Sequence, residues 1–263
     1  MTDTQTDNSD FNFTAGSLRA FMATSAEDLI RSQELRYEIF FEEMQVEASP
    51  EIKALKRDFD KYDEFCDHLL IEDTSINKIV GSYRILRRSK LPAGMKFYSA
   101  KEFALDNMLS HFKGEVMELG RACVDINYRD RSTIQLLWRA IGEYSAKYDI
   151  ELMFGCGSFN GANHKDHAAA LSYLYHNHLA PADFRPSAVT EAFKPINLLP
   201  MDAIDAKRTL ASLPPLIKGY LRLGGFIGDG AFEDHESNTT DVCIVLKMDT
   251  LSQKYFEKFA PKS

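Results

Sequence analysis

The sequence predicts an α/β (α+β) fold in which a mixed central sheet carries helices on both faces. The stretches DHLLIED and KIVGSYRILRR, joined by TSIN, predict an antiparallel hairpin. Further along, GEVMELGRACV and IELMFGCGSF are apolar enough for strands, and a helical pattern over 132–148 separates them. The helical stretch HKDHAAALSYLYHNH and the last strand, DVCIVLKM, follow. Hairpins followed by strands that alternate with helices favour a mixed sheet.

Three further segments complete this prediction. A first helix over 26–43 begins with a capping box, in which Ser25 caps the helix and Asp28 lies three residues later. Arg36 and Phe40 are four residues apart, so they are neighbours on its surface. The polar stretch 47–67 is too long for a simple turn and predicts a functional loop. LPPLIKGYLRLGG predicts a short helix with proline near its start and glycine after its end.

The composition limits the classes of protein to consider. The chain has 263 residues, 44% of them hydrophobic, which is enough for one sizeable core. A net charge of -8 argues against a general nucleic-acid binder, which needs a basic surface. No stretch approaches the roughly 20 apolar residues of a membrane span.

These features predict one domain at 18–255, between a disordered polar tail at 1–17 and a second tail at 256–263. The first residues, MTDTQTDNSD, lack the basic and apolar segments of a secretory signal, so we expect a cytoplasmic protein. The four cysteines form no CxxC pair and are expected to be reduced structural thiols. His164 and His167 lack a clear third ligand, so no metal site is predicted.

The strand MELGRACV carries two ionisable groups, Glu118 and Arg121, whose burial is costly unless they are paired or used. Residues three apart on a regular strand point to opposite faces. Gly120 lies between them, and a bulge there would turn both groups toward one cleft. A structural ion pair or two charges at the sheet edge explains the same pattern.

The segment DINYRDRST leads from this strand into a helix. Its candidate anion-binding groups are Arg129, Arg131 and Ser132, with Ser132 or Thr133 as the helix cap. A helix N-terminus offers unpaired N–H groups and a positive dipole, which suit the phosphate of pantetheine or the pyrophosphate of coenzyme A. An ordinary solvated helix start is the alternative.

Basic islands interrupt the acidic chain, and they suit an acidic partner protein by charge complementarity. They consist of Lys53, Lys56 and Arg57; Arg87, Arg88 and Lys90; and Arg129 and Arg131.

Several stretches in this order resemble the ornithine lipid acyltransferases, hemolysin-like members of the GNAT superfamily, over roughly 18–250. They are LRYEIFFEEM, FDKYDEFCDHLLI, IVGSYRIL, FYSAKEF, MELGRACV, LLWRAIGEY, GCGSFNG, ALSYLYHNHLAP, LPPLIKGYLRLGGFIGDGAFED and TTDVCIVLK. The resemblance implies a GNAT-like sheet and transfer of a 3-hydroxyacyl chain from acyl carrier protein to the α-amine of L-ornithine. It implies no cofactor beyond the phosphopantetheine thioester of the carrier protein, which is a co-substrate.

A more distant resemblance to acyl-homoserine lactone synthases supplies site residues, namely Arg36 and Phe40, Phe59-Asp60, Arg84, and Glu118 with Arg121. The two resemblances together imply these roles. Glu118 is the general base, and Arg121 and Arg84 hold the acyl or pantetheine portion. Arg36 binds the amino-acid carboxylate beside Phe40, and Asp60 or Asp63 binds the ornithine ammonium. The donor side is formed by Val124, Arg129, Arg131 and Ser132.

Three alternatives stay open from the sequence. The acceptor could be another amino acid or amine, the donor could be coenzyme A, and the chain could be a non-catalytic module that binds acyl carrier protein. Acyl chain length, the 3-hydroxyl preference and the oligomeric state also stay open. Peripheral contact with the inner face of the cytoplasmic membrane would use Leu216, Ile217 and Leu221 of LPPLIKGYLRLGG, whose alternative role is in the core.

Overall fold

The computed structural model describes residues 11–249, which divide into two compact units. Within the described residues, the first unit comprises 11–86 and 119–148, and the second comprises 87–118 and 149–249. The sequence predicted one domain over 18–255. The division falls inside one strand, β6 (Glu115–Val124), because its first four residues belong to the second unit and the rest to the first.

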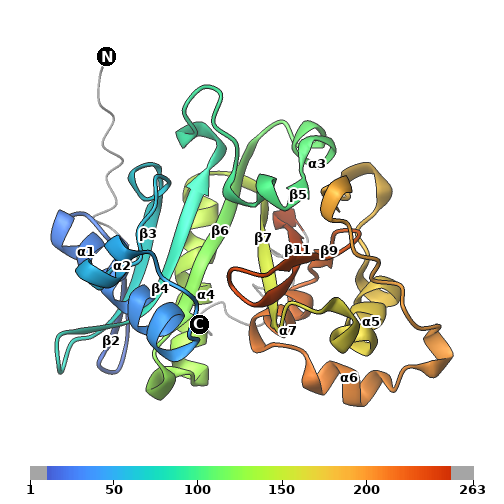
Figure 1. Cartoon of the computed structure of the whole chain (residues 1–263). Helices are drawn as coiled ribbons and strands as arrows, with labels where there is room; N and C mark the ends of the chain where they lie inside the picture. The colour runs from blue at the N-terminus through green and yellow to red at the C-terminus, as the bar shows by residue number, and fades with distance from the viewer. Residues whose placement is uncertain (1–10, 250–263) are drawn as a thin grey trace. The chain divides into compact units, whose positions relative to one another are not determined.

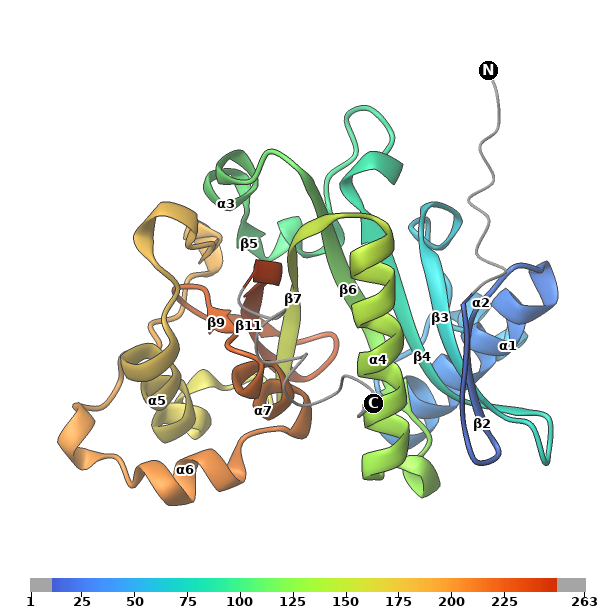
Figure 2. The same cartoon turned by 180° about the vertical axis from the view of Figure 1, so that it is seen from behind.

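The first unit contains four antiparallel neighbours, in the order β1-β2-β3-β4, followed by the second part of β6. Two helices lie on opposite faces of these strands, α1 on one side and α4 on the other (Figures 1 and 2). The hairpin predicted from DHLLIED and KIVGSYRILRR is confirmed as β3 and β4. The elements are β1 (Asn12–Ala15), β2 (Leu18–Met22), α1 (Ala26–Tyr37), α2 (Pro50–Leu55), β3 (Asp67–Asp73), β4 (Lys78–Arg87, whose last residue belongs to the second unit) and α4 (Arg131–Lys147).

The disorder predicted for 1–17 is wrong for its second part, because β1 already begins at Asn12. Phe11 is buried, and its ring centroid lies 5.9 Å from that of Tyr144 on α4. The Arg139 guanidinium stacks on Phe13 at 4.9 Å. Two aromatic side chains therefore tie down a stretch whose neighbours are polar. Residues 1–10 and 250–263 lie outside the described part, including the predicted tail 256–263.

The first helix begins as predicted but ends earlier. Ser25 accepts the N–H of Asp28, and the Asp28 carboxylate accepts the N–H of Ser25, which completes the capping box. The α-helix ends at Tyr37, and 38–43 continue as a wider π-helical turn. Such turns are typical of functional sites, and this one carries Phe40.

In the second unit, the strand order is β6-β7-β11-β10, and β9 pairs with β11. β6 and β7 are parallel from Glu115↔Ile150 to Glu118↔Phe154, where their pairing ends. β7, β11, β10 and β9 join through antiparallel pairs. The elements are β5 (Phe103–Ala104), α3 (Asp106–His111), β7 (Ile150–Asn160), α5 (Ala168–His178), β8 (Ser187–Ala188), α6 (Ala206–Ser212), α7 (Pro215–Arg222), β9 (Phe226–Ile227), β10 (Phe232–Asp234) and β11 (Thr239–Lys247).

The helix predicted from LPPLIKGYLRLGG is confirmed as α7, with Pro215 at its start and Gly224 after its end at φ 91°. α7 packs on β7 and β11, and this packing buries Ile217 and Leu221. The alternative role in the core therefore holds for Ile217 and Leu221, and nothing in the part of the chain that the structure describes supports the membrane contact. Among residues 11–249, no helix combines the length and apolar character that a membrane crossing requires.

Candidate active site

Six charged side chains of the first unit form a network that we call the arginine–aspartate cluster: Arg36, Arg84, Arg121, Asp58, Asp60 and Asp63. The Arg36 side chain is fully buried and lies at its centre. Its Nε donates to Asp58 Oδ2 at 2.8 Å, and Nη2 donates to the Asp58 carbonyl at 2.6 Å. Nη1 and Nη2 each donate to Asp63 at 3.0 Å. Such a bidentate pair is among the strong charge-assisted contacts.

Asp63 links this pair to Arg84 on β4. Arg84 Nη1 donates to Asp63 Oδ1 at 3.0 Å and to Asp60 Oδ1 at 2.7 Å. Burial alone would raise the pKa of Asp63, but the Arg36 hydrogen bond and the charges of Arg36 and Arg84 hold it well below its usual range. Asp63 is therefore ionised at neutral pH, and its charge is balanced within the unit.

The outer edge of the cluster consists of Arg121 and Asp60, whose side chains are 28% and 24% exposed. Arg121 lies 3.3 Å from Asp58 and 3.8 Å from Asp60, and its guanidinium lies 5.6 Å from the centre of the Phe40 ring. Its φ of 50° is left-handed, a conformation that costs a non-glycine residue about 1–2 kcal/mol. The predicted irregularity of this strand therefore lies at Arg121, one residue after Gly120.

The structure brings Arg36, Arg84, Arg121, Asp60 and Asp63 together, as the predicted site requires, and adds Asp58, which sequence reasoning missed. It also changes what these groups can do. The buried donors of Arg36 point to Asp58 and Asp63, which favours a structural role over the predicted binding of a substrate carboxylate. Asp63 likewise accepts from Arg36, Arg84 and Gln33, and its binding of an ornithine ammonium stays a prediction.

Glu118 belongs to the second unit and is buried. Its carboxylate accepts the backbone N–H groups of Tyr98 and Ser99 at 2.7 Å each and the Ser99 hydroxyl at 2.5 Å. These three donors fix the orientation of the carboxylate. They also hold the turn Tyr98–Lys101, whose Ser99 carbonyl accepts the N–H of Glu102 at 3.0 Å. Glu118 therefore fixes the position of the segment that leads into Glu102.

The start of α4 differs from its prediction. Asp130, and not Ser132 or Thr133, caps the helix, because its carboxylate accepts the Thr133 N–H at 2.9 Å. Aspartate is as good a cap as serine, and its charge complements the helix dipole. Arg129 Nε donates to the carbonyl of Val124 at 2.9 Å, and its Nη2 pairs with Glu43 at 2.7 Å. Arg131 and Ser132 are exposed.

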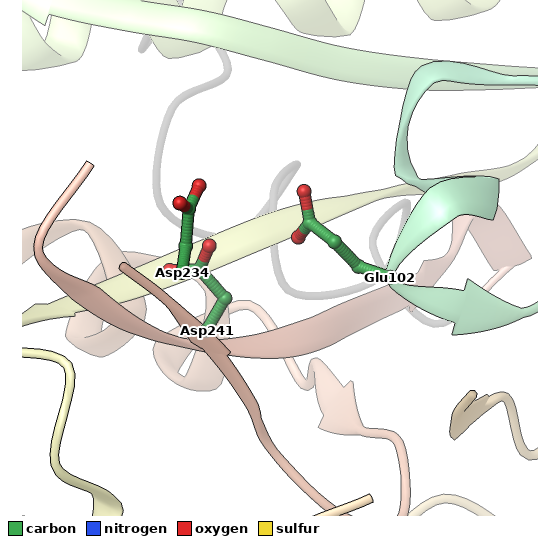
Figure 3. A group of neighbouring side chains, drawn as sticks. All are labelled: Glu102, Asp234 and Asp241. Carbon is green, nitrogen blue, oxygen red and sulfur yellow. The ribbon is translucent and has the colours of Figure 1, made fainter. Parts of the chain in front are cut away.

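A second group of acidic side chains lies in the second unit, and we call it the carboxylate cluster: Glu102, Asp234 and Asp241 (Figure 3). One carboxylate oxygen of each lies within 4.8 Å of the others, which is close enough to hold a metal ion. Sequence reasoning predicted no metal site and did not find this group. Burial, and then the charge of Asp241, raise the pKa of Glu102 to about 7.

Three of the four cysteines are poor nucleophiles. Burial raises the pKa of Cys123 to about 12, and it also raises the pKa values of Cys156 and Cys243 above the ordinary range. The thiolate is the reactive form, so these three buried thiols are protonated at neutral pH. The Cys156 thiol donates to Glu102 Oε2 at 3.1 Å. These findings agree with the structural role that the sequence predicted.

The residues that sequence reasoning missed do carry a signal. Asp241 opens the strand sequence DVCIVLK as its one charged group before Lys247, much as Glu118 stands out in MELGRACV. Glu102 lies in FYSAKEF and Asp234 at the end of GDGAFED. Glu102 lies more than a hundred residues before Asp234 and Asp241 in the chain, so only the folded unit shows that the three side chains meet.

Two curated relatives cover most of the chain. An L-ornithine N(alpha)-acyltransferase of Rhizobium meliloti (strain 1021) is 45% identical over 248 residues, which is 92% of this chain and 84% of the relative. An L-ornithine N(alpha)-acyltransferase of Agrobacterium fabrum (strain C58 / ATCC 33970) is 39% identical over 98% of this chain and 90% of the relative.

Comparisons of domain and fold agree with these relatives. The model of the acetyltransferase (GNAT) domain matches residues 35–139. FeeM, an N-acyl amino acid synthase from uncultured soil microbes, has a TM-score of 0.52 at 10% identity and covers 90% of this chain and 94% of its own. MesI, a CoA-dependent acyl-homoserine lactone synthase, has a TM-score of 0.51 at 12% identity, over 93% of this chain and 97% of its own. The predicted GNAT-like sheet is confirmed.

Proposed function

The chain belongs to the family of the L-ornithine N(alpha)-acyltransferases, and we propose that it transfers a 3-hydroxyacyl chain from acyl carrier protein to the α-amine of L-ornithine. The observation that carries this proposal is 45% identity to a relative of that name over 92% of the chain. The product would be a lyso-ornithine lipid.

The proposed reaction replaces a thioester with an amide. The α-amine attacks the thioester carbonyl carbon, the C–N bond forms, and the C–S bond breaks. The proton lost by the amine goes to a base, and the pantetheine thiolate receives a proton. We assign the base to Glu118, directly or through water. The donors from Tyr98 and Ser99 support this assignment, because they hold the buried carboxylate in one position, and a base must be held within reach of the proton that it removes.

In the first unit, differences in exposure support a division of the proposed roles. Arg121 and Asp60 are the partly exposed members of the arginine–aspartate cluster, so they are the groups that we propose to face the substrates. Arg84 is 4% exposed and holds Asp60 and Asp63, which makes it a positioning residue. The Arg84–Asp60 and Asp58–Arg121 salt bridges thus hold the partly exposed edge of the cluster, at little cost in side-chain entropy because Arg84 and Asp58 are buried.

The choice of acyl carrier protein as donor is supported by exposed basic groups of the first unit. Lys53 and Lys56 on and after α2 are exposed, as are Arg129 and Arg131 around the start of α4. Arg88, in contrast, donates to the carbonyls of Leu109, Phe112 and Gly114 and holds its own unit together. An acidic carrier protein would meet the exposed groups with complementary charge.

A reconstituted reaction tests this function. Purified protein is given 3-hydroxyacyl carrier protein and L-ornithine, and the product is identified by mass spectrometry. We expect N-acylornithine, and we expect Glu118→Gln to lower kcat roughly 10²–10⁴-fold. Glu115→Gln on the same strand is the matched control and should leave the rate unchanged. Comparable turnover in the Glu118→Gln enzyme would remove the base assignment, and acyl transfer from the coenzyme A thioester alone would change the donor.

A further inference from the structure

The carboxylate cluster is a group of three acidic side chains, found among residues 11–249, that the roles assigned above leave unused. Glu102 leads from the turn Tyr98–Lys101 into β5, Asp234 ends β10, and Asp241 lies on β11, so three segments of one unit bring them together (Figure 3). Glu102 is 2% exposed and Asp241 is 5% exposed, whereas Asp234 is partly exposed. The cluster thus consists of two buried carboxylates and a third that solvent partly reaches.

Asp241 has one carboxylate oxygen without a donor, although its side chain also hydrogen-bonds Ser158 and Thr239. Its Oδ1 is buried and has no hydrogen-bond donor among the side chains and backbone of residues 11–249. Figure 3 shows its carboxylate directed toward those of Asp234 and Glu102. Buried acceptors are normally satisfied, and an exception requires a reason such as an absent ligand. The orphaned oxygen therefore points to a ligand that donates hydrogen bonds.

The charge of the cluster points to a cation. Lys101 Nζ lies 3.3 Å from Glu102 Oε1 and is the basic group that faces the cluster from its own segment. Lys101 also donates to the Tyr98 hydroxyl at 3.0 Å. One ammonium thus faces three carboxylates. The raised pKa values of Glu102 and Asp241, caused first by burial, express the same excess of negative charge.

We propose that the carboxylate cluster binds the side-chain ammonium of the amine substrate. An ammonium has three N–H donors and no acceptor, which suits three carboxylates with an orphaned oxygen. The nearby Lys101 opposes a divalent metal ion more strongly than it opposes a singly charged ammonium. This inference rests on the proposed function and names the group that would select ornithine among amino acids.

The negative charge of the cluster also decides which amino group of ornithine binds there. Negative neighbours favour the charged form of an ammonium, so an amine held there is a poor nucleophile. The cluster therefore suits the δ-ammonium, which stays charged throughout the reaction, and not the attacking α-amine. In the first unit, Asp60 Oδ2 also lacks a hydrogen-bond donor, but Asp60 and Asp63 lie within 4 Å of guanidinium groups that oppose a second cation, so we assign this role to the carboxylate cluster instead.

The test compares L-ornithine with L-norvaline, which has the same carbon chain and no side-chain ammonium. We expect the wild-type enzyme to prefer ornithine and Asp241→Asn to raise its KM for ornithine by roughly 10–100-fold, since a charged hydrogen bond is lost. The KM for norvaline should not change. Asp229→Asn, the same substitution outside the cluster, is the control. Asp241→Asn should also raise the melting temperature, because it removes a charge from a repulsive group, whereas a purely structural role predicts a lower one.

A second variant and a binding measurement keep the outcomes separate. Asp234→Asn should raise the KM for ornithine in the same way, which provides a test even if the Asp241→Asn variant does not fold. If calorimetry shows selective binding of ornithine over norvaline but no acyl transfer follows, the proposed function fails and the cluster assignment stands. If wild type acylates both amino acids equally well, the function stands and the assignment is overturned. Thermal stabilisation by Mg²⁺ or Mn²⁺ that Asp241→Asn abolishes would also overturn it, in favour of a metal.

Discussion

Replacing Arg36 with methionine separates a structural arginine from a substrate ligand. Methionine is unbranched and apolar, and it fills much of the space of the arginine stem but lacks the guanidinium. It deletes the donors to Asp58 and Asp63, which are 2% and 6% exposed. Two buried carboxylates then lose a cation, and loss of one member of a buried pair costs about 3–5 kcal/mol.

The remaining contacts place the expected cost at the lower end of that range. Asp63 keeps Arg84 Nη1 at 3.0 Å and Gln33 Nε2 at 2.9 Å, and Asp58 keeps Arg121 Nε at 3.3 Å. A loss of about 3 kcal/mol corresponds to a drop of roughly 6–12 °C in melting temperature, at ~2–4 °C per kcal/mol for a chain of this size.

The assay is thermal unfolding of the wild-type protein, Arg36→Met, Asp63→Asn and the double variant. The double variant should lose less stability than the sum of the single ones, because the two residues share hydrogen bonds. The pKa of Asp63 is lowered in the folded state, so its contribution to stability is present above its unfolded pKa and is lost as pH falls. An unchanged melting temperature together with a raised KM for ornithine would refute this reasoning and return Arg36 to the role of substrate ligand.

Three further predictions concern the groups around the site. Gly120→Ala should stabilise the fold by about 0.5–1 kcal/mol, since an added Cβ meets nothing within 4 Å and the φ of Gly120 is not left-handed. A lower kcat/KM for the acyl donor would show that the donor uses the open space beside Gly120. A loss of stability would contradict the reasoning. The KM for ornithine should fall as pH rises through about 7, where Glu102 ionises, while the KM for norvaline stays level. Because the pKa of Glu102 is raised in the folded state, the ligand-free protein should lose stability as pH rises toward about 7. Identical pH profiles of KM for both amino acids would count against the assignment. Lys53→Glu combined with Arg131→Glu should raise the KM for the carrier protein and leave that for a pantetheine thioester unchanged, and an equal effect on both donors would argue against docking there.

Much of the fold could be predicted from local patterns. The capping box at Ser25, the β3–β4 hairpin and α7 were each predicted from a few neighbouring residues, and each is confirmed. The errors arose where contacts between distant segments decide. β1 forms because Phe11 and Phe13 pack on α4, and nothing in their polar neighbours shows it. The cap of α4 is Asp130 because an equally good capping residue lies two residues before Ser132.

The sequence predicted which residues assemble at the candidate site better than it predicted the role of each. Arg36, Arg84, Arg121, Asp60 and Asp63 do assemble, but their partners decide their roles, and partners depend on the fold. A guanidinium that donates to two buried carboxylates is a structural element, although its sequence pattern is the same as that of a substrate ligand. The carboxylate cluster was missed for the same reason, since Glu102 and Asp241 come together only in the folded unit.

Mass spectrometry of lipids tests the central claim most directly. The gene is expressed in a bacterial host that makes no amino-acid-containing lipids, beside the Glu118→Gln and Glu115→Gln variants. The account predicts a new ion with the mass of 3-hydroxyacyl-ornithine in the wild-type and Glu115→Gln strains, and its loss with Glu118→Gln. The absence of any new acylated amine, with folded protein and acyl carrier protein present in the host, would contradict the account.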